Sequence, residues 1–232
     1  RGRGQPTYSL VAEIGSYGTI NTAASGAGKI GPWSFAFSGT AQRADGFSRY
    51  GYRIDRLAGA NSIDGVRGGK LEPDGFGRLG GFGRLGYDPN TGFRFEVSAL
   101  ATQTRAQTDG GSGAAVPSAS TFPDTASTID RTFGQISARA ELDGLDGAMT
   151  NSLQVFGART ERNVIDSRLS RTGGILRETR TSSDFIGDRA GAEYLATFRL
   201  QQFGSVIAGA RFERESAETF SASISPVATR RI

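Results

Sequence analysis

The feature that most constrains this chain is the alternation of apolar and polar residues in about nine short segments. A period of two places successive side chains on opposite faces of a β-strand. The alternation is clearest where Phe93, Phe95, Val97, Ala99 and Ala101 are interleaved with Arg94, Glu96, Ser98 and Thr102. No long segment has a helical period of 3.6 residues. The sequence therefore predicts an all-β protein whose strands have one apolar and one polar face.

The predicted strands are similar in length to the 9–11 residues with which a tilted strand crosses a bilayer. They are Pro6–Ile14, Thr19–Lys29, Trp33–Ala41, Phe76–Tyr87, Gly92–Thr104, Phe133–Leu142, Thr150–Thr160, Arg189–Arg199 and Val206–Glu215. Large aromatic residues such as Trp33, Tyr87 and Phe198 lie near the ends of these segments, whereas Gly and Ala occupy the middle. This distribution is typical of a lipid-facing wall with aromatic girdles.

Short and long connections alternate along the chain. Tight turns are predicted at Lys29–Pro32, Asp88–Gly92, Asp143–Ala148 and Gln201–Gly204. Between them lie three polar stretches that are far longer than a hairpin needs, Asp45–Asp74, Thr108–Asp130 and Thr160–Asp184. Membrane β-barrels have short periplasmic turns and longer extracellular loops. We therefore expect an antiparallel transmembrane β-barrel, here an incomplete barrel of about nine meandering strands.

Composition narrows the chemistry. The 232 residues include no Cys and no His, which excludes Ser-His-Asp triads, Cys-His dyads and thiolate or imidazole metal sites. We therefore do not expect an enzyme. The net charge of +4 is spread among interspersed acidic residues and forms no basic stripe, so no nucleic-acid partner is expected.

Glycine patterns in the chain resemble nucleotide-binding motifs only superficially. Three G-x-G-x-x-G matches begin at Gly26, Gly75 and Gly81. Each lies within or beside a predicted strand, whereas a dinucleotide fingerprint must open a helix. The last two form a tandem hexapeptide, 75–80 and 81–86, which we interpret as a strand built from a duplicated unit.

Candidate ligand contacts lie in the predicted long loops. Tyr50, Tyr52 and Phe122 are candidate nutrient contacts, and solvated loop aromatics are the alternative. Asp109, Asp124 and Asp130 are candidate oxygen ligands for Ca²⁺. Their spacing matches no EF-hand loop, and solvated carboxylates are the simpler interpretation; no cofactor is otherwise expected.

Several segments together resemble the barrel domain of TonB-dependent outer-membrane receptors, most nearly members similar to the vitamin B12 receptor. They are Ser9–Glu13, Gly15–Gly18, Trp33–Gly39, Ala44–Ser48, Leu85–Pro89, Phe93–Ser98 and Ala208–Glu215. Arg1–Pro6 resembles the junction between plug and barrel. Nothing in the chain matches the family's plug domain or its TonB box.

The resemblance implies energised import of a scarce nutrient, of the cobalamin or iron-siderophore type, through the outer membrane of a Gram-negative bacterium. The implied partners are outer-membrane lipid and lipopolysaccharide, the receptor's own plug domain, TonB and the nutrient. A barrel of this class needs about 22 strands. We therefore expect residues 1–232 to be the N-terminal part of such a barrel.

Two alternatives remain open. A soluble antiparallel sheet with one face on a core gives the same alternation, so the chain is alternatively a soluble all-β carbohydrate-binding or adhesin domain. A small outer-membrane enzyme barrel, such as a phospholipase or protease, is a third interpretation that the absence of His disfavours.

Overall fold

The computed structural model describes residues 4–47, 74–108, 121–122, 127–172, 175–224 and 229–231. Nine strands form one antiparallel sheet in the order β1-β2-β3-β4-β5-β7-β8-β9-β10. Their bounds are β1 (Thr7–Gly15), β2 (Thr19–Ile30), β3 (Trp33–Ala44), β4 (Phe76–Tyr87), β5 (Phe93–Thr108), β7 (Ser127–Gly144), β8 (Met149–Thr172), β9 (Ile175–Arg199) and β10 (Ser205–Ile224). The predicted all-β class and the meander of nine strands are confirmed.

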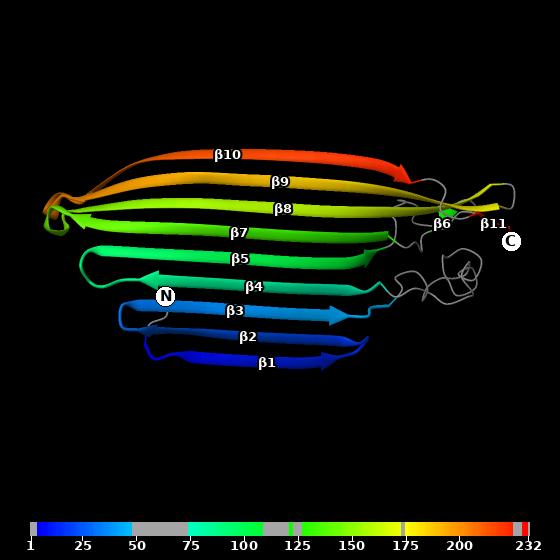
Figure 1. Ribbon diagram of the computed structural model, residues 1–232, viewed down its shortest axis with the longest axis horizontal. Coiled ribbons are helices and arrows are strands. Elements are labelled where there is room, and N and C mark those ends of the chain that lie inside the picture. Colours follow the sequence, from blue (N-terminus) through cyan, green and yellow to red (C-terminus); the bar gives the residue numbers. More distant parts are fainter. Residues whose placement is uncertain are drawn as a thin grey trace.

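Two short strands lie off this path. β6 (Thr121–Phe122) pairs with β8, and β11 (Thr229–Arg231) pairs with β9. Two single-turn 3-10 helices, η1 (Leu145–Gly147) and η2 (Gln201–Phe203), lie in the β7–β8 and β9–β10 turns. β1 and β10 are the outermost strands and do not pair with each other, so the sheet is open (Figure 1).

The four predicted tight turns lie at the same end of the strands, and we call this side of the sheet the turn edge (Figure 1). Two long connections, after β3 and β5, leave the opposite edge, together with the short β1–β2 turn and the two-residue connection between β8 and β9. Left-handed backbone in the turns explains their sequences: Gly31 has φ 58°, Gly92 has φ 80° and Asn90 has φ 62°. These are residue types that tolerate positive φ.

The predicted loop at Thr160–Asp184 is wrong. β8 continues to Thr172 and β9 begins at Ile175, and the two strands pair throughout, for example Arg162 with Phe185. β9 is 25 residues long, well beyond the predicted bilayer-crossing length. The sequence signal failed because this part of both strands is mostly polar, and its few apolar residues, such as Val164 and Ile165, fall on both faces, so no alternation marks it.

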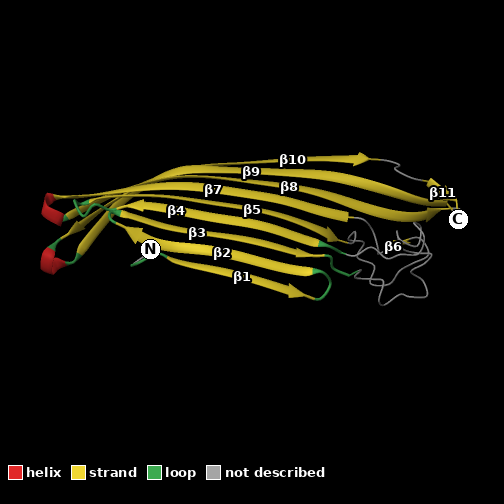
Figure 2. Cartoon of the chain, turned by 60° about the horizontal axis from the view of Figure 1, so that its bottom comes forward, coloured by secondary structure: helices red, strands yellow, loops and turns green. Residues whose placement is uncertain are grey.

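The sheet is a single layer (Figure 2). Among the described residues, Ala196 is the only buried hydrophobic residue, and large side chains such as Leu10, Ile136 and Phe212 are exposed. No second layer covers either face in the described part of the chain. The elements are therefore joined by backbone ladders and not by a central hydrophobic core.

Candidate functional site: the two faces of the sheet

The pairing register assigns every strand residue to one of two faces, because directly opposed residues share a face. One register row runs through Leu10, Ala24, Gly39, Gly81, Ala101 and Gly134. We call the face with this row the apolar face and the other the polar face. The predicted facing of Phe93–Ala101 is confirmed, with Arg94 and Glu96 on the polar face.

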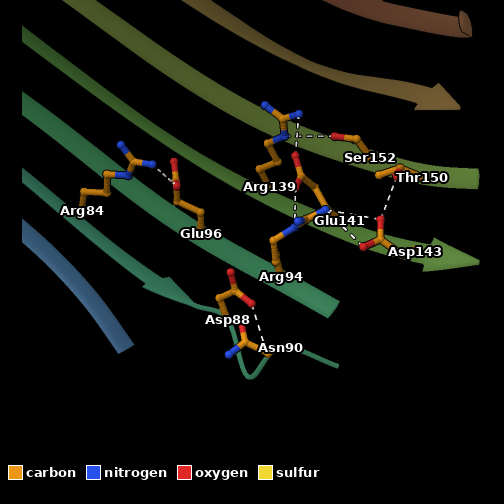
Figure 3. A network of polar contacts seen from close by, with 10 residues as sticks. All are labelled: Arg84, Asp88, Asn90, Arg94, Glu96, Arg139, Glu141, Asp143, Thr150 and Ser152. Atoms are coloured by element: carbon orange, nitrogen blue, oxygen red, sulfur yellow. Dashed lines mark hydrogen bonds and ion pairs between the residues drawn. The ribbon is translucent and has the colours of Figure 1, made fainter. Parts of the chain in front are cut away.

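The polar face has an ion-pair network near the turn edge, spanning β5 and β7 (Figure 3). Arg94 Nε lies 2.9 Å from one carboxylate oxygen of Glu141, and Arg139 Nη2 lies 2.7 Å from the other, as ion pairs. Arg94 also contacts Asp143 at 3.3 Å. The Glu141 side chain is only 14% exposed, so two arginines neutralise a largely desolvated carboxylate.

Side chains of β8 complete this network. Arg139 donates a hydrogen bond from Nε to Ser152 Oγ at 3.0 Å, and Thr150 donates to Asp143 at 2.7 Å. A separate pair, Arg84 and Glu96, joins β4 to β5 beside it. These contacts connect four adjacent strands and fix the orientation of each charged side chain (Figure 3).

A second network lies on the polar face of β9 and β10. Arg211 contacts Glu213 at 2.6 Å and Glu193 at 3.5 Å, and Arg189 pairs with Glu213. Both guanidinium groups lie over the ring of Phe156, at 5.7 Å for Arg189 and 5.4 Å for Arg211. These distances are within the range of cation–π attraction.

The second network lines an open cleft of about 820 Å³ between β7 and β10. Gln135, Gln154 and Thr160 add neutral hydrogen-bonding groups to the lining. Because the charged groups described in its lining are each in an ion pair, the cleft offers a hydrogen-bonding surface with no unpaired charge among those groups. Such a surface suits contact with a polar solute or a polar polypeptide.

The apolar face changes character farther from the turn edge. Along each strand, the apolar side chains of this face are followed, on the side away from the turn edge, by a polar residue. These polar residues are Arg43 on β3, Gln103 on β5, Thr132 on β7, Arg159 on β8, Asp188 on β9 and Arg214 on β10. We call the apolar residues between this border and the turn edge the apolar band. Arg159 Nε donates a hydrogen bond to Glu161 Oε1 at 2.6 Å, and Arg159 Nη1 lies 3.5 Å from the carboxylate of Asp188 at this border.

The residues predicted as ligand contacts are not brought together in the described part of the chain. Tyr50, Tyr52, Asp109 and Asp124 lie outside the described residues. Phe122 is in β6, opposite Leu169 of β8. Asp130 is in β7 and its carboxylate is 3.7 Å from Arg105 of β5, so its described contact is an ion pair. Among the described residues no group of three or more acidic side chains could hold a metal ion.

Sequence reasoning missed the two networks as sites. It placed Arg94 on the polar face but could not say which carboxylate the guanidinium group meets, because that depends on strand register. The relevant signal was the pairing of Arg and Glu at alternate positions in neighbouring strands.

Comparisons with known proteins identify no relative: no family model, no curated protein and no solved structure matches the chain. No helix among the described residues has the length and apolarity needed to cross a bilayer.

Proposed function

We propose that this chain forms part of the wall of a transmembrane β-barrel in the outer membrane of a Gram-negative bacterium. We further propose that the barrel belongs to a TonB-dependent receptor that imports a scarce nutrient. The membrane proposal rests on the geometry of the apolar band, and the transport proposal rests on the sequence resemblance.

The observation that supports membrane residence best is the slope of the band. One register row joins Arg43 of β3 to Phe220 of β10. Arg214, the first polar residue of the same face on β10, is six residues nearer the turn edge than Phe220. From β3 to β10 there are six strand spacings, which is about 29 Å across the sheet. Over that distance the border moves by about 20 Å along the strands. The strands are inclined to the normal of this border by about 35°, which matches the tilt of membrane barrels.

The limit of the band at the turn edge shifts in the same direction, so the band keeps its height. On β3 this limit is at Trp33, the first residue of the strand. The register row of Trp33 reaches Ala210 on β10, but β10 itself begins five residues nearer the turn edge, at Ser205. On β5 the band runs from Phe93 to Ala101, about 27 Å along the strand. At a tilt of about 35° this is about 22 Å along the normal, close to the 25 Å apolar belt of outer-membrane barrels.

A soluble carbohydrate-binding or adhesin domain is supported less well. Such a domain buries one face of its sheet against a second layer. Here the described sheet is a single layer and leaves residues such as Leu10, Leu153 and Phe212 exposed. Contact with lipid accounts for a continuous apolar band better than contact with water does.

The transport proposal also fits the polar face. Paired Arg and Glu side chains, such as Arg94 with Glu141 and Arg211 with Glu193, suit a water-filled or plug-filled lumen. In this orientation the turn edge is periplasmic and the long connections are extracellular. Cargo of the cobalamin or iron-siderophore type, a plug domain and TonB follow from the family resemblance.

The membrane proposal can be tested by cysteine labelling, because the chain has no Cys of its own. Single variants Ala99→Cys and Ala138→Cys place a thiol on the apolar band, whereas Ser98→Cys and Ser137→Cys place one on the polar face. In outer membranes, a hydrophilic maleimide should label the polar-face thiols after plug removal and leave the band thiols unlabelled. Equal labelling of Ala99→Cys and Ser98→Cys would contradict membrane insertion.

The transport proposal needs a separate test. A strain lacking the parent gene should lose uptake of radiolabelled cobalamin or of a ferric siderophore, and the plasmid-borne gene should restore it. Uptake should also stop in a strain lacking TonB. Normal uptake of a panel of such nutrients without the gene would contradict this class of transporter while leaving the membrane proposal standing.

A further inference from the structure

A shallow groove of about 870 Å³ crosses the apolar face from β4 to β10. Most of its floor consists of small residues, including Gly81, Ala101, Gly134 and Gly157, and Ile136 is a large apolar side chain of the same face in its lining. A Cβ atom added to Gly81 or Gly134 would meet no atom within 4 Å, so the space above them is open. Leu85, Val97 and Val155 are larger side chains on the turn-edge side of the floor, on a register row that also contains Ala138.

The groove follows a register row and therefore slopes through the apolar band. Gly81, Ala101 and Gly134 lie on the row that ends at Arg159 and Asp188. Because such rows are inclined to the border by about 35°, the β4 end of the groove lies deep in the band. Its β9–β10 end opens at the polar border. An amphipathic ligand with its head at the border would thus place an apolar chain along the floor.

The charged end of the groove has one arginine that is not engaged by the described residues. Arg159 already contacts Glu161 at 2.6 Å and Asp188 at 3.5 Å, which compensates the charge of Asp188. Arg214 lines the groove, is exposed, and makes no ion pair with any described residue. A guanidinium group in this position can bind a phosphate group through two parallel hydrogen bonds.

We propose that this groove binds one acyl chain of lipopolysaccharide, with a phosphate of the head group at Arg214. The proposal rests on the membrane orientation given above, in which the border faces outward and the outer leaflet supplies this lipid. Apolar complementarity along the floor and charge complementarity at Arg214 both point to a phosphate-bearing lipid. A second copy of the chain would bring another charged border against Arg159, Asp188 and Glu161, which favours lipid as the occupant.

The first test removes the charge. The full-length protein is purified from outer membranes in mild detergent, and bound lipopolysaccharide is counted by native mass spectrometry. Arg214→Gln should lower the bound fraction at least threefold. Arg43→Gln, which alters a 75% exposed arginine at the same border but far from the groove, should leave it unchanged. Unchanged binding in Arg214→Gln, or equal loss in both variants, would overturn the proposal.

The second test fills the groove. Gly134→Leu should reduce the bound lipid, whereas Gly77→Leu should not, although an added Cβ is equally unobstructed at both glycines. Gly77 lies on the same face of β4, outside the groove. Retention of lipopolysaccharide by Gly134→Leu would contradict the assignment. Finding phosphatidylglycerol or a second protomer bound to the unaltered protein in place of lipopolysaccharide would also contradict it. If Gly134→Leu does not assemble, Arg214→Gln still decides the outcome. If these variants do not change lipopolysaccharide binding while the band thiols stay unlabelled by maleimide, the lipid site is refuted and the membrane proposal is not.

Discussion

Trp33 and Tyr87 lie directly opposite each other on β3 and β4, with ring centroids 4.7 Å apart, at the turn-edge limit of the apolar face. Phe95 of β5 continues the same register row. Amphipathic aromatic rings prefer the depth at which a membrane meets water. Trp33 and Tyr87 therefore mark one border of the proposed lipid-facing band on β3 and β4, opposite the border that contains Arg43 and Arg214.

The depth of Trp33 is the first prediction. Because it is the only Trp of the chain, its fluorescence reports a single position. In vesicles, emission from the inserted chain should be quenched more by lipids brominated near the head group than by lipids brominated near the chain end. Stronger quenching from the chain end, or none from any brominated lipid, would contradict an interfacial position.

A charge in the middle of the band is the second prediction. Ala138 of β7 is in register with Val97 and Val155 on the apolar face. Ala138→Arg should lower the free energy of unfolding in lipid by about 2–4 kcal/mol, the usual cost of a lipid-facing arginine near the midplane. The measurement is urea unfolding in vesicles.

The matched control for that variant is Gln135→Arg on the same strand. Gln135 lies on the polar face, directly opposite Leu100 and Ala158. An arginine introduced at position 135 therefore has no other arginine directly opposite it. Its effect should be below about 1 kcal/mol, as for a lumen-facing substitution. Equal costs for the two variants would show that the two faces meet the same solvent.

The network of Figure 3 gives the third prediction. Glu141→Gln leaves Arg94 and Arg139 close together without their shared, largely buried counter-charge. We expect a loss of about 2 kcal/mol in the free energy of unfolding, less than for a fully buried pair because both arginines are partly exposed. Glu161→Gln is the control: its side chain is 54% exposed, and an exposed ion pair contributes only about 0–1 kcal/mol. A larger effect at Glu161 than at Glu141 would contradict this ranking.

The sequence predicted the fold where one face is apolar and failed where both faces are polar. Alternation placed Phe93–Ala101 on a strand with the correct facing. The same reasoning assigned Thr160–Asp184 to a loop, because segments such as Glu161, Arg162 and Asn163 contain no apolar face to reveal their period. The slope of the band was also inaccessible, because it depends on register between strands and not on any one strand.

The candidate sites were less predictable than the fold for a related reason. Loop residues such as Tyr50 and Asp109 were chosen by residue type, and they lie outside the described residues. The contacts of Arg94 with Glu141 and of Arg211 with Phe156 join residues far apart in the chain. Only the pairing of strands brings such residues together, so residue type and spacing alone could not identify them.

The last prediction concerns Gly191, which is directly opposite Phe156 on β8. A Cβ atom at position 191 would lie 2.6 Å from Phe156 Cζ and 2.7 Å from the backbone oxygen of Phe212. The ring therefore covers the glycine, an arrangement known to stabilise glycine within sheets. Because the Phe212 oxygen belongs to the β10 backbone, it cannot rotate away as a side chain can.

Gly191→Ala should therefore lower the free energy of unfolding by about 1–3 kcal/mol, the usual cost of overpacking, and should displace the ring on which Arg189 and Arg211 lie. Gly157→Ala is the control, because the nearest atom to its added Cβ is the Arg189 oxygen at 4.0 Å. Relief of glycine's conformational entropy should make this control neutral or stabilising by up to about 1 kcal/mol. Urea unfolding in vesicles measures both variants, and a Gly191→Ala variant as stable as Gly157→Ala would show that Phe156 does not need the space above Gly191.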